Sequence, residues 1–515
     1  MKHNIKRSLI LLSTVLLAIF LLVACGDGDE SASKDDGNNN NNTEEQNDSN
    51  VEDAGEPTQI SMMATLHTPE VPDDRVLKEI ERAANVELNI EWVPDNNYAD
   101  KLNTAFATET FPQIVPVGMQ QFNQFKDAIR DGQFWEIGPY LGDYENLGKL
   151  KDEILENTKV DGKLYSLYQG SSLSRQGLIY RKDWADNLGL EAPTNLEEFY
   201  DMAKAFTEDD PNENGKDDTF GLTDRSDLIY GAFKTIASWH GTPNYWGEKD
   251  GELLPEFMFD EYMDTMNFMK DLRDNGYMNQ DFPVTSKEDQ QDMFKNGTAG
   301  MYVGAMSDVL SMYHDAIELN PDLEYDVHNY IEGPDGEFNI WAIPGYGSVV
   351  MFPKSAIETE EELREILTFY NKMMTPELSN LAKWGFEGEH YTLKDGYVIM
   401  DDDQAKYERE VLPFGTLNIG EPETNGQYDS FFEYETRQKA AELIKENENH
   451  LVHDPTNALE SDTAVRDGDR LQEIINDATY NYILGEIDED GFYAQVEKWK
   501  EEGGNDIIAE FNAAK

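Results

Sequence analysis

The sequence predicts an α/β protein of two or more lobes whose C-terminal part is rich in helices. The chain has 515 residues, which is more than one ordinary hydrophobic core accommodates. After residue 57, short apolar strand patterns alternate with helical patterns, and this alternation favours an α/β lobe with a mainly parallel sheet. After residue 430, helical spacing of the apolar residues predominates.

The elements at the start of this α/β part follow from the spacing of their apolar residues. The sequence VELNIEWV, at 86–93, alternates apolar and polar residues like a half-buried strand. Before it, Val76, Leu77 and Ile80 recur at helical spacing. The predicted strands are 59–65, 86–93 and 112–117, and the predicted helices are 73–84 and 98–108.

The same periodicities, together with turn and capping residues, predict the rest of the chain. Thr194 or Asn195 caps a helix that has acidic residues in its first turn, and Pro376 ends another helix. Residues 161–165 form a turn that enters a strand. Further strands are predicted at 178–181, 300–303 and 345–352. Further helices are predicted at 182–188, 195–206, 261–275, 290–296, 360–374, 431–447, 469–484 and 490–513.

The composition excludes several classes of function. The chain has 104 Asp and Glu against 41 Lys and Arg, a net charge of −63, which argues against nucleic acid as a partner because phosphate binding needs a basic surface. A single cysteine excludes an intrachain disulfide framework and a cysteine-rich zinc module. The sequence also lacks the glycine-rich motifs that cradle phosphates.

The first 24 residues are predicted to be an export signal. Lys2, Lys6 and Arg7 precede an apolar stretch, 8–24, which alone would also suit a short membrane anchor. The stretch ends in LVAC, which resembles the lipobox of bacterial lipoproteins, where the cysteine receives a diacylglyceryl group. Because each buried acyl CH₂ contributes about 0.8 kcal/mol, two chains anchor stably. We therefore predict a lipid anchor at Cys25 on the outer face of the cell membrane; the alternative is an ordinary signal peptide followed by a chance cysteine.

Residues 25–56 are predicted to be a disordered acidic tether. The stretch is of low complexity, with acidic residues on either side of an asparagine run at 38–42. It has too few apolar side chains to bury a core. Its place directly after Cys25 predicts a solvated connection between the membrane and the folded part; the alternative is a tail of no consequence.

An ordered set of short motifs gives the folded part a family resemblance. The motifs are FPQIV at 111–115, VDGKLY at 160–165, RKDW at 181–184, LGL at 188–190, PT at 193–194, EEF at 197–199, DPNENGKDDTFGL at 210–222, and WGFEG at 384–388 with Tyr391. Together they resemble the large lipoprotein solute-binding subunits of carbohydrate ABC importers, the LplA and alginate-binding type of family 1. The resemblance covers 57–515, with Gln113 where aspartate is usual.

The resemblance implies two α/β lobes, a periplasmic-binding-protein-like fold that closes on its ligand like a hinge. It implies discontinuous lobes, the first of 57–173 plus 322–374 and the second of 174–321 plus 375–515. It also implies a non-enzymatic protein that captures an oligosaccharide between the lobes and delivers it to the permease subunits of an ABC importer.

An acidic loop at 210–221 is a candidate calcium site. Asp210, Asn212 and Asn214 occupy positions 1, 3 and 5 of an EF-hand-like run, and Gly215 at position 6 permits the sharp turn. The further ligands would be the backbone carbonyl of Lys216 and the carboxylate of Asp218. Position 12 is Gly221 instead of glutamate, which argues against a true EF-hand switch. The resemblance implies one structural calcium ion; the alternative is a solvated acidic turn.

Aromatic residues in loops are the candidate ligand site, because aromatic rings offer sugar C–H faces a flat apolar platform and polar side chains fix the hydroxyls. The segment 239–246 contains three aromatics among Gly and Pro, and loops run over the surface. For each aromatic the alternative is packing in the core. The candidate ligand-binding residues are Trp239, Asn244, Tyr245, Trp246, Trp341, Tyr346, Trp384 and Glu387.

Three basic residues are possible partners for a sugar carboxylate. Arg175, Arg181 and Lys234 are able to meet a uronate, but they also suit surface positions or salt bridges. The net charge repels a polyanion at long range, although a local basic cleft can override this repulsion. We therefore expect a neutral or weakly charged oligosaccharide.

Two rival functions stay open at this point. A secreted glycosidase or lyase needs a pair of carboxylates, and 104 acidic residues always offer one, so the pair carries no information. No G-x-S-x-G or H-E-x-x-H motif occurs, and we predict no catalytic residues. The second rival is a binder of peptides or another solute on the same scaffold, because a fold does not fix its ligand.

Overall fold

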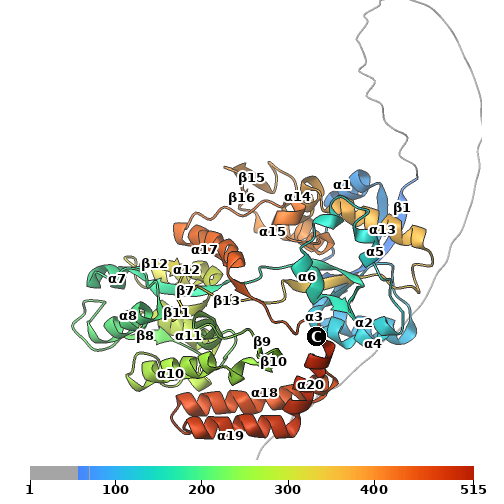
Figure 1. Ribbon diagram of the computed structural model, residues 1–515. Coiled ribbons are helices and arrows are strands. Elements are labelled where there is room, and N and C mark those ends of the chain that lie inside the picture. Colours follow the sequence, from blue (N-terminus) through green and yellow to red (C-terminus); the bar gives the residue numbers. More distant parts are fainter. Residues whose placement is uncertain (1–55, 69) are drawn as a thin grey trace, which may run out of the picture. The chain divides into compact units, whose positions relative to one another are not determined.

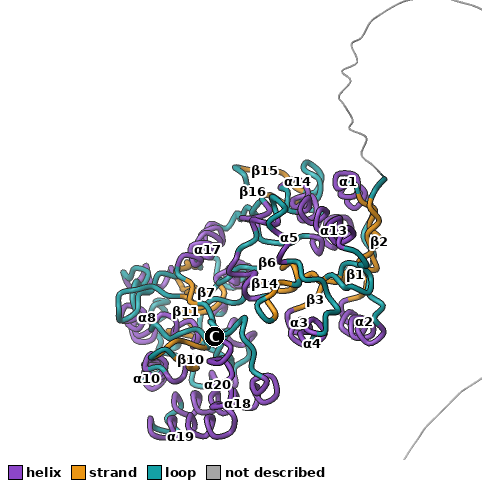
Figure 2. Tube along the Cα trace, turned by 45° about the vertical axis from the view of Figure 1, so that its right-hand side comes forward, coloured by secondary structure: helices purple, strands orange, loops and turns teal. Residues whose placement is uncertain are grey.

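The fold is described from a computed structural model, in which residues 56–68 and 70–515 are placed (Figures 1 and 2). The predicted export signal at 1–24, Cys25 and the predicted tether up to residue 55 lie outside the described residues. Within the described residues, buried apolar side chains form two large cores and one small cluster.

The first core is built from 60–173 and 346–419. Its strands are β1 (Thr58–Leu66), β2 (Val86–Pro94), β3 (Val115–Gly118), β4 (Lys159–Val160), β5 (Lys163–Leu164), β6 (Ser166–Gly170) and β14 (Tyr346–Met351). Its helices are α1 (Arg75–Ala84), α2 (Asp95–Thr108), α3 (Met119–Gln124), α4 (Lys126–Arg130), α5 (Gly138–Leu141), α6 (Asp152–Asn157), α13 (Glu360–Met373) and α14 (Pro376–Trp384). The hairpin β15 (Tyr391–Lys394) and β16 (Tyr397–Met400), α15 (Gln404–Glu410), the 3₁₀ helix η5 (Leu412–Leu417) and α16 (Pro422–Asn425) follow.

A β1–α1–β2 unit opens this core, as the sequence pattern predicts. β1 pairs in parallel with β2, and Val76, Ile80 and Ala84 of α1 are buried. Helices cover both faces of the strands: α1 and α13 lie on one side, and α2, α3 and α4 on the other (Figure 2). The strand prediction at 59–65 and the helix prediction at 73–84 are therefore confirmed.

The predicted parallel sheet is only partly correct. β14 pairs antiparallel with both β3 and β6, giving the order β3–β14–β6. The reason is long-range: β14 enters this core from the other core, so its direction is not set by a neighbouring helix crossover as in a βαβ unit. The sheets of the described part are therefore mixed.

The second core is built from 178–341 and 471–511. Its four-stranded sheet has the order β12–β7–β11–β8, formed by β7 (Gln176–Arg181), β8 (Phe220–Thr223), β11 (Ala299–Ala305) and β12 (Tyr325–His328). The short strands are β9 (Trp246–Lys249), β10 (Glu252–Pro255), β13 (Ile340–Trp341) and β17 (Leu451–Val452). The helices of this part are α7 (Lys182–Leu188), α8 (Leu196–Glu208), α9 (Ala232–Trp239), α10 (Asp260–Asp274), α11 (Lys287–Lys295), α12 (Val309–Ile317), α17 (Glu435–Glu446), α18 (Asp462–Ile483), α19 (Glu489–Trp499) and α20 (Asn505–Ala514).

Local signals account for several of these helices. The Asn195 side chain accepts a hydrogen bond from the backbone N–H of Glu198 at 3.0 Å, which caps α8 as predicted.

The predicted helix at 490–513 is two helices, because a π-turn at 500–504 separates α19 from α20. α18 and α19 lie side by side (Figure 1). Among the described residues, no helix has both the length and the apolar character needed to cross a bilayer.

Buried side chains place two stretches in a different core from the one predicted. Leu378, Val411 and Leu417 pack in the first core, so the expectation that everything from 375 to 515 belongs to the second lobe is wrong. Apolar residues between 331 and 341 pack in the second core, whereas we expected 322–374 in the first. These cores favour a first lobe of 57–173 plus 346–420, because buried contacts, not sequence order, decide membership.

A close approach of α8 to β8 gives the first testable prediction. A Cβ added at Gly221 would lie 2.5 Å from both the Cα and the carbonyl oxygen of Ala203, which are backbone atoms that a rotamer change cannot move. We expect Gly221→Ala to lower the free energy of unfolding by about 1–3 kcal/mol, measured by urea denaturation. The matched control is Gly142→Ala, where no atom lies within 4 Å and φ is −67°, and which should be neutral. Equal midpoints for the two variants would contradict this packing argument.

Candidate functional site

Two adjoining cavities are the candidate site. The first has a volume of about 600 Å³ and the second about 740 Å³, and Gly170, Lys383, Pro422 and Gln427 line both of them. Both volumes fall within the range of about 300–1,000 Å³ that is typical of small-molecule sites. Because they share these four lining residues, the two cavities are together called the groove.

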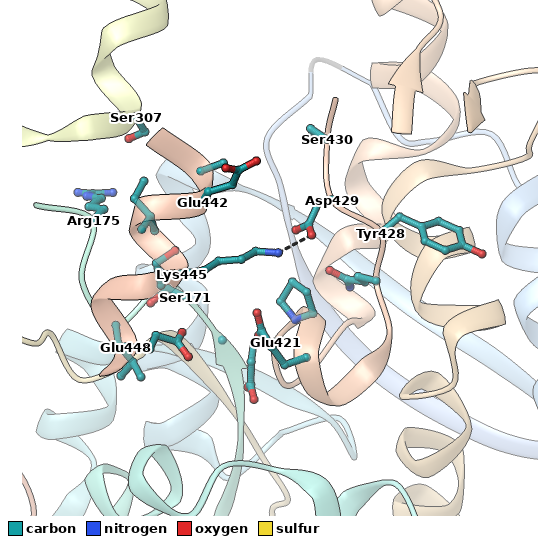
Figure 3. A pocket seen from close by; sticks show the side chains of 18 of the residues that line it. Ser171, Arg175, Ser307, Glu421, Tyr428, Asp429, Ser430, Glu442, Lys445 and Glu448 are labelled. Atoms are coloured by element: carbon teal, nitrogen blue, oxygen red, sulfur yellow. Dashed lines mark hydrogen bonds and ion pairs between the residues drawn. The ribbon is translucent and has the colours of Figure 1, made fainter. Parts of the chain in front are cut away.

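The first cavity is framed by segments of different cores (Figure 3). Residues 170–175 continue from β6 of the first core, while Ser307 in the 3₁₀ helix η4 (Met306–Asp308) and the helix α17 pack with the other core and its small cluster. Residues 421–432 connect the two sets. A ligand here would contact elements that belong to separate cores, which is the arrangement that a hinge needs.

The second cavity lies within the first core. Thr65, His67 and Thr68 line it at the carboxyl end of β1, and Val117 and Gly118 line it at the end of β3. The position agrees with the general rule that ligands of open α/β sheets bind outside the carboxyl ends of the strands.

A backbone contact between Gly170 and Gly420 forms the wall between the cavities. The Gly170 N–H donates to the Gly420 carbonyl at 3.0 Å, and the Gly420 N–H donates to the Tyr168 carbonyl at 2.9 Å. A Cβ at Gly170 would lie 2.6 Å from the Gly420 oxygen, so only glycine permits this approach. The contact places Glu421 and Pro422 beside the end of β6.

Ion pairs fix part of the first cavity. Lys445 of α17 pairs with Asp429, as the dashed line in Figure 3 shows, and Lys151 pairs with Glu448 at 2.8 Å. Glu421 is buried and accepts a hydrogen bond from the Tyr168 hydroxyl at 2.7 Å. Burial raises the pKa of the Glu421 carboxyl above its ordinary value, and the Tyr168 hydrogen bond opposes this effect.

Three other cations of the first cavity have no hydrogen bond or ion pair from their side chains to any described residue. They are Arg175, Lys383 and Arg437. Desolvation lowers the pKa of the Lys383 ammonium and of the Arg437 guanidinium, and no carboxylate offsets it. Sequence reasoning singled out Arg175 but missed Lys383 and Arg437, because nothing in the chain near them marks them as different from the other cations.

The aromatic side chains of the first cavity are Trp384, Tyr397, Tyr428 and Phe432. The Trp384 indole N–H donates to the Tyr428 carbonyl at 3.1 Å, which fixes its ring beside the cavity. Trp384 is thus the one candidate among the predicted ligand residues that lines either cavity of this groove. Glu387 is exposed and does not line either cavity.

The structure places four of the candidate ligand residues in packing roles. Trp239 ends α9 and is 0% exposed, with its ring 5.6 Å from that of Phe199. Trp341 is 1% exposed, and its indole N–H donates to the Thr235 hydroxyl at 3.0 Å. Tyr346 packs in the first core, and the Asn244 amide donates to two backbone carbonyls. Their rings and amide face protein atoms, so we correct the expectation that they contact a ligand.

Tyr245 and Trp246 lie elsewhere, in a cavity of about 290 Å³ between β10 and the C-terminal helices. The Tyr245 ring faces the Lys234 ammonium at 3.9 Å. The buried Lys234 pairs with Glu256, and the buried Arg181 pairs with Asp183. Lys234 and Arg181 therefore have structural partners, as the salt-bridge alternative predicts.

The predicted calcium loop folds around Asp210. The Asp210 carboxylate accepts hydrogen bonds from the backbone N–H groups of Asn214 and Gly215 at 3.1 and 2.9 Å. The side-chain amide of Asn214 donates to the Asp218 carboxylate at 3.0 Å. Gly221, at position 12, touches the backbone of α8, which explains why no glutamate stands there. No cluster of three or more His, Cys, Asp or Glu side chains suited to a metal occurs in the described part of the chain.

Comparison with known proteins decides the family. The family model described as bacterial extracellular solute-binding protein matches residues 69–377. The polygalacturonan/rhamnogalacturonan-binding protein YtcQ of Bacillus subtilis strain 168 is 44% identical over 467 residues, 88% of this chain and 91% of its own. The chain belongs to the bacterial extracellular solute-binding protein family.

Further relatives agree with this family. Lipoprotein LipO of the same Bacillus strain is 36% identical over 472 residues, 89% of this chain and 92% of its own. An HMO-binding, ABC-transporter-associated solute-binding protein of Bifidobacterium longum infantis superposes with a TM-score of 0.65 at 15% identity, covering 89% of this chain and 98% of that one. The fructooligosaccharide-binding FusA of Streptococcus pneumoniae with kestose superposes with a TM-score of 0.58 at 17% identity, covering 88% and 98%. These structures confirm the two-lobed α/β fold.

Membership of the family settles the first rival function. Solute-binding proteins bind their cargo without altering it, so this chain is a binding protein and not an enzyme. The prediction of a non-enzymatic binding subunit is therefore confirmed.

The wall between the two cavities gives a prediction for the site. Gly170→Ala would bring a methyl group within 2.6 Å of the Gly420 oxygen and 3.0 Å of the Glu421 Cβ. We expect the variant to lose about 1–3 kcal/mol of unfolding free energy and to reshape both cavities, which should weaken ligand binding at least tenfold. Urea denaturation and calorimetric titration measure the two effects, with Gly142→Ala as the control. Wild-type affinity in Gly170→Ala would show that this contact does not shape the groove.

Proposed function

We propose that this protein captures an oligosaccharide in the groove formed by the two cavities and delivers it to the permease subunits of an ABC importer. The observation that carries the proposal is the groove itself. Elements of separate cores frame it, and Trp384 lies beside Ser, Gln, Lys and Glu side chains in a protein of the solute-binding family. Closure of the lobes on the ligand would follow the hinge motion typical of such folds.

The chemistry of the groove suits a sugar. Trp384 and Tyr428 offer apolar ring faces to the C–H surface of a pyranose, and Gln427, Ser171 and Ser430 offer hydrogen-bonding groups to its hydroxyls. The relative named for binding polygalacturonan and rhamnogalacturonan supports oligosaccharides from these polymers as the first ligands to test. Glu387 stays a candidate hydroxyl partner only if lobe movement brings it to the groove.

Two features of the chain support a place at the outer surface of the cell. The LVAC motif at 22–25 supports diacylglyceryl attachment at Cys25, and the relative named lipoprotein LipO agrees with it. The acidic stretch that follows would then tether the lobes to the membrane. Labelling with a radioactive fatty acid in the producing cell would test the anchor, and a Cys25→Ser variant that is still labelled would contradict it.

The central test is ligand-dependent stability. A ligand that binds only the folded protein stabilises it by about 2.7 kcal/mol at a hundredfold excess over Kd, so thermal unfolding in the presence of each glycan should show a higher midpoint. Thin-layer chromatography of the recovered glycan should show it unchanged. Stabilisation by peptides but by none of the glycans would favour the rival binding function over this proposal.

Trp384 supplies a prediction for the sugar platform. Trp384→Ala removes the ring beside the cavity and should weaken glycan binding about tenfold, measured by calorimetric titration. Tyr493→Ala is the control, because Tyr493 is 40% exposed on α19 and lines neither cavity. If both variants bind like the parent, stacking on Trp384 has no part in recognition.

The loop at 210–218 is proposed to hold one structural calcium ion. Its donors are all oxygens, as calcium prefers: the carboxylates of Asp210 and Asp218, the amide oxygens of Asn212 and Asn214, and the Lys216 carbonyl. In the described conformation the Asn212 and Asn214 amides donate to Asp218. Their side-chain oxygens accept hydrogen bonds from the backbone N–H groups of Asn214 and Lys216 at 3.2 and 2.9 Å, so a bound cation would share these oxygens with the backbone. The likeness to an alginate-binding protein solved without calcium and to a FusA EF-hand mutant is consistent with this proposal.

Removal of the metal tests the loop. Addition of EDTA should lower the thermal midpoint of the parent, and excess Ca²⁺ should restore it, because an ion that binds only the folded state stabilises it. Asp210→Ala should have the lower midpoint already and ignore EDTA. Asp217→Ala is the matched control, since it removes an equal charge from the same loop without removing a proposed ligand. A parent protein that ignores EDTA would contradict the calcium site.

A further inference from the structure

The charge of the first cavity differs from that of the chain. Acidic residues outnumber basic ones by 104 to 41 in the sequence, so a random patch of this protein is strongly negative. The cavity, in contrast, is lined by five basic residues, Lys151, Arg175, Lys383, Arg437 and Lys445, and by five acidic ones, Glu421, Glu423, Asp429, Glu442 and Glu448. The basic residues are therefore concentrated here, where a ligand would lie.

Two of the five cations hold the walls together and three do not. Lys151 and Lys445 pair with Glu448 and Asp429 across the cavity. The side chains of Arg175, Lys383 and Arg437 make no ion pair or hydrogen bond with any of residues 56–68 and 70–515. Structural ion pairing therefore accounts for the first two cations and leaves the other three without a carboxylate partner among the described residues.

Arg437 is the most informative of the three. Its Nη1 is buried and has no hydrogen-bond acceptor, while its guanidinium carbon lies 4.0 Å from the centre of the Phe432 ring. A buried guanidinium N–H without an acceptor costs free energy. Burial also lowers the pKa of the Arg437 guanidinium, because desolvation disfavours its charged form. Phe432 holds the planar group in place, so it is positioned in advance for an acceptor that the described protein does not supply.

Lys383 lies where the two cavities meet. It lines both of them, and its backbone carbonyl is fixed by the Tyr407 hydroxyl at 3.0 Å. Its ammonium lies 5.5 Å from the Trp384 ring, the proposed sugar platform. A sugar seated on Trp384 would therefore carry its substituents close to this charge.

Arg175 completes the set on the other flank of α17. Figure 3 places its side chain on the same side of that helix as Ser307, and opposite Lys445 and Asp429. Its backbone carbonyl accepts a hydrogen bond from Met306 at 2.9 Å, which fixes the loop that presents the exposed guanidinium. The three cations without ion pairs thus come from separate segments and line one cavity.

We propose that the groove selects a glycan that carries carboxylates, a uronate oligosaccharide, and that Arg437, Lys383 and Arg175 are the residues that recognise its negative charges. This inference rests on the proposed function and deepens it. Arginine pairs with a carboxylate through two parallel hydrogen bonds, and lysine contributes a point charge. It replaces the expectation of a neutral or weakly charged ligand, which was drawn from the net charge and from the salt-bridge alternative for the cations.

The rival explanation is that the three cations only offset the negative field of the protein. In a chain of net charge −63, a cation gains energy from many distant carboxylates and needs no single partner. This explanation predicts no preference for the charge of the sugar. The two explanations therefore differ in ligand selectivity, which is measurable.

A matched pair of ligands separates the explanations. Trigalacturonate and its fully methyl-esterified form have the same rings and linkages, but the ester lacks the charges. By calorimetric titration we expect the acid to bind at least tenfold more tightly than the ester at 0.1 M NaCl. The preference should shrink at 1 M NaCl, where screening is strong. Equal affinities for acid and ester would overturn the inference while leaving oligosaccharide capture intact.

Variants assign the preference to residues. Arg437→Gln and Lys383→Met should each weaken binding of the acid about tenfold more than they weaken binding of the ester, because the recognition of charge is lost. Lys204→Met is the matched control: Lys204 is an exposed lysine on α8 without a partner among the described residues, and it lies outside both cavities. Unchanged thermal midpoints would show that the variants are folded.

The possible outcomes separate a failure of the uronate inference from a failure of the proposed oligosaccharide-binding function. Selectivity for the acid that survives in Arg437→Gln, Lys383→Met and an Arg175→Gln variant would overturn the assignment of these residues. Binding of neither trigalacturonate nor its ester, nor of any neutral oligosaccharide, would overturn the proposed function itself.

Discussion

The groove depends on one backbone contact, the approach of Gly170 to Gly420 without a side chain on either residue. β6 ends there, and the chain leaves the first core within a few residues. Because the contact holds 420–422 against the end of β6, the segment that leads to α17 starts from a fixed point. Ion pairs between residues far apart in the sequence also join the two cores: Lys126 and Arg130 of α4 pair with Glu460, just before α18. The walls of the groove are therefore positioned by contacts between segments that are distant in sequence.

Charge distribution gives the groove its selectivity within a strongly acidic protein. Most carboxylates of the described residues are exposed or half-buried, where hydration and screening limit their mutual repulsion. In the first cavity, ion pairs satisfy Lys151 and Lys445, whereas Arg437 is held by the Phe432 ring and not by a carboxylate. A partner carboxylate from the protein would have competed with a ligand. Holding the guanidinium by an aromatic ring fixes its position and leaves its N–H groups available.

The sequence predicts those parts of the molecule that short-range patterns decide. The β1–α1–β2 unit follows from alternation and helical spacing within 40 residues, and the cap at Asn195 is a local signal. The antiparallel direction of β14 and the membership of Leu378 and Leu417 in the first core depend on contacts between distant segments, which no local pattern contains. The same limit applies to the site. The sequence around Trp239 and Trp384 does not show which of the two contacts a ligand. In the structure, Trp239 ends a buried helix, whereas Trp384 lines the groove.

The loop after α8 illustrates how packing restricts chemistry. It joins α8 to β8, and the first residues of β8 lie so close to α8 that position 12 of the loop must be glycine. A glutamate there would give a calcium ion its bidentate ligand, but its Cβ would occupy the space of the Ala203 backbone. Any cation held by this loop therefore binds through the first part of the loop alone. It can brace the connection between α8 and β8, but it cannot pull β8 toward itself as a switch would, because the packing of the strand against the helix is already complete.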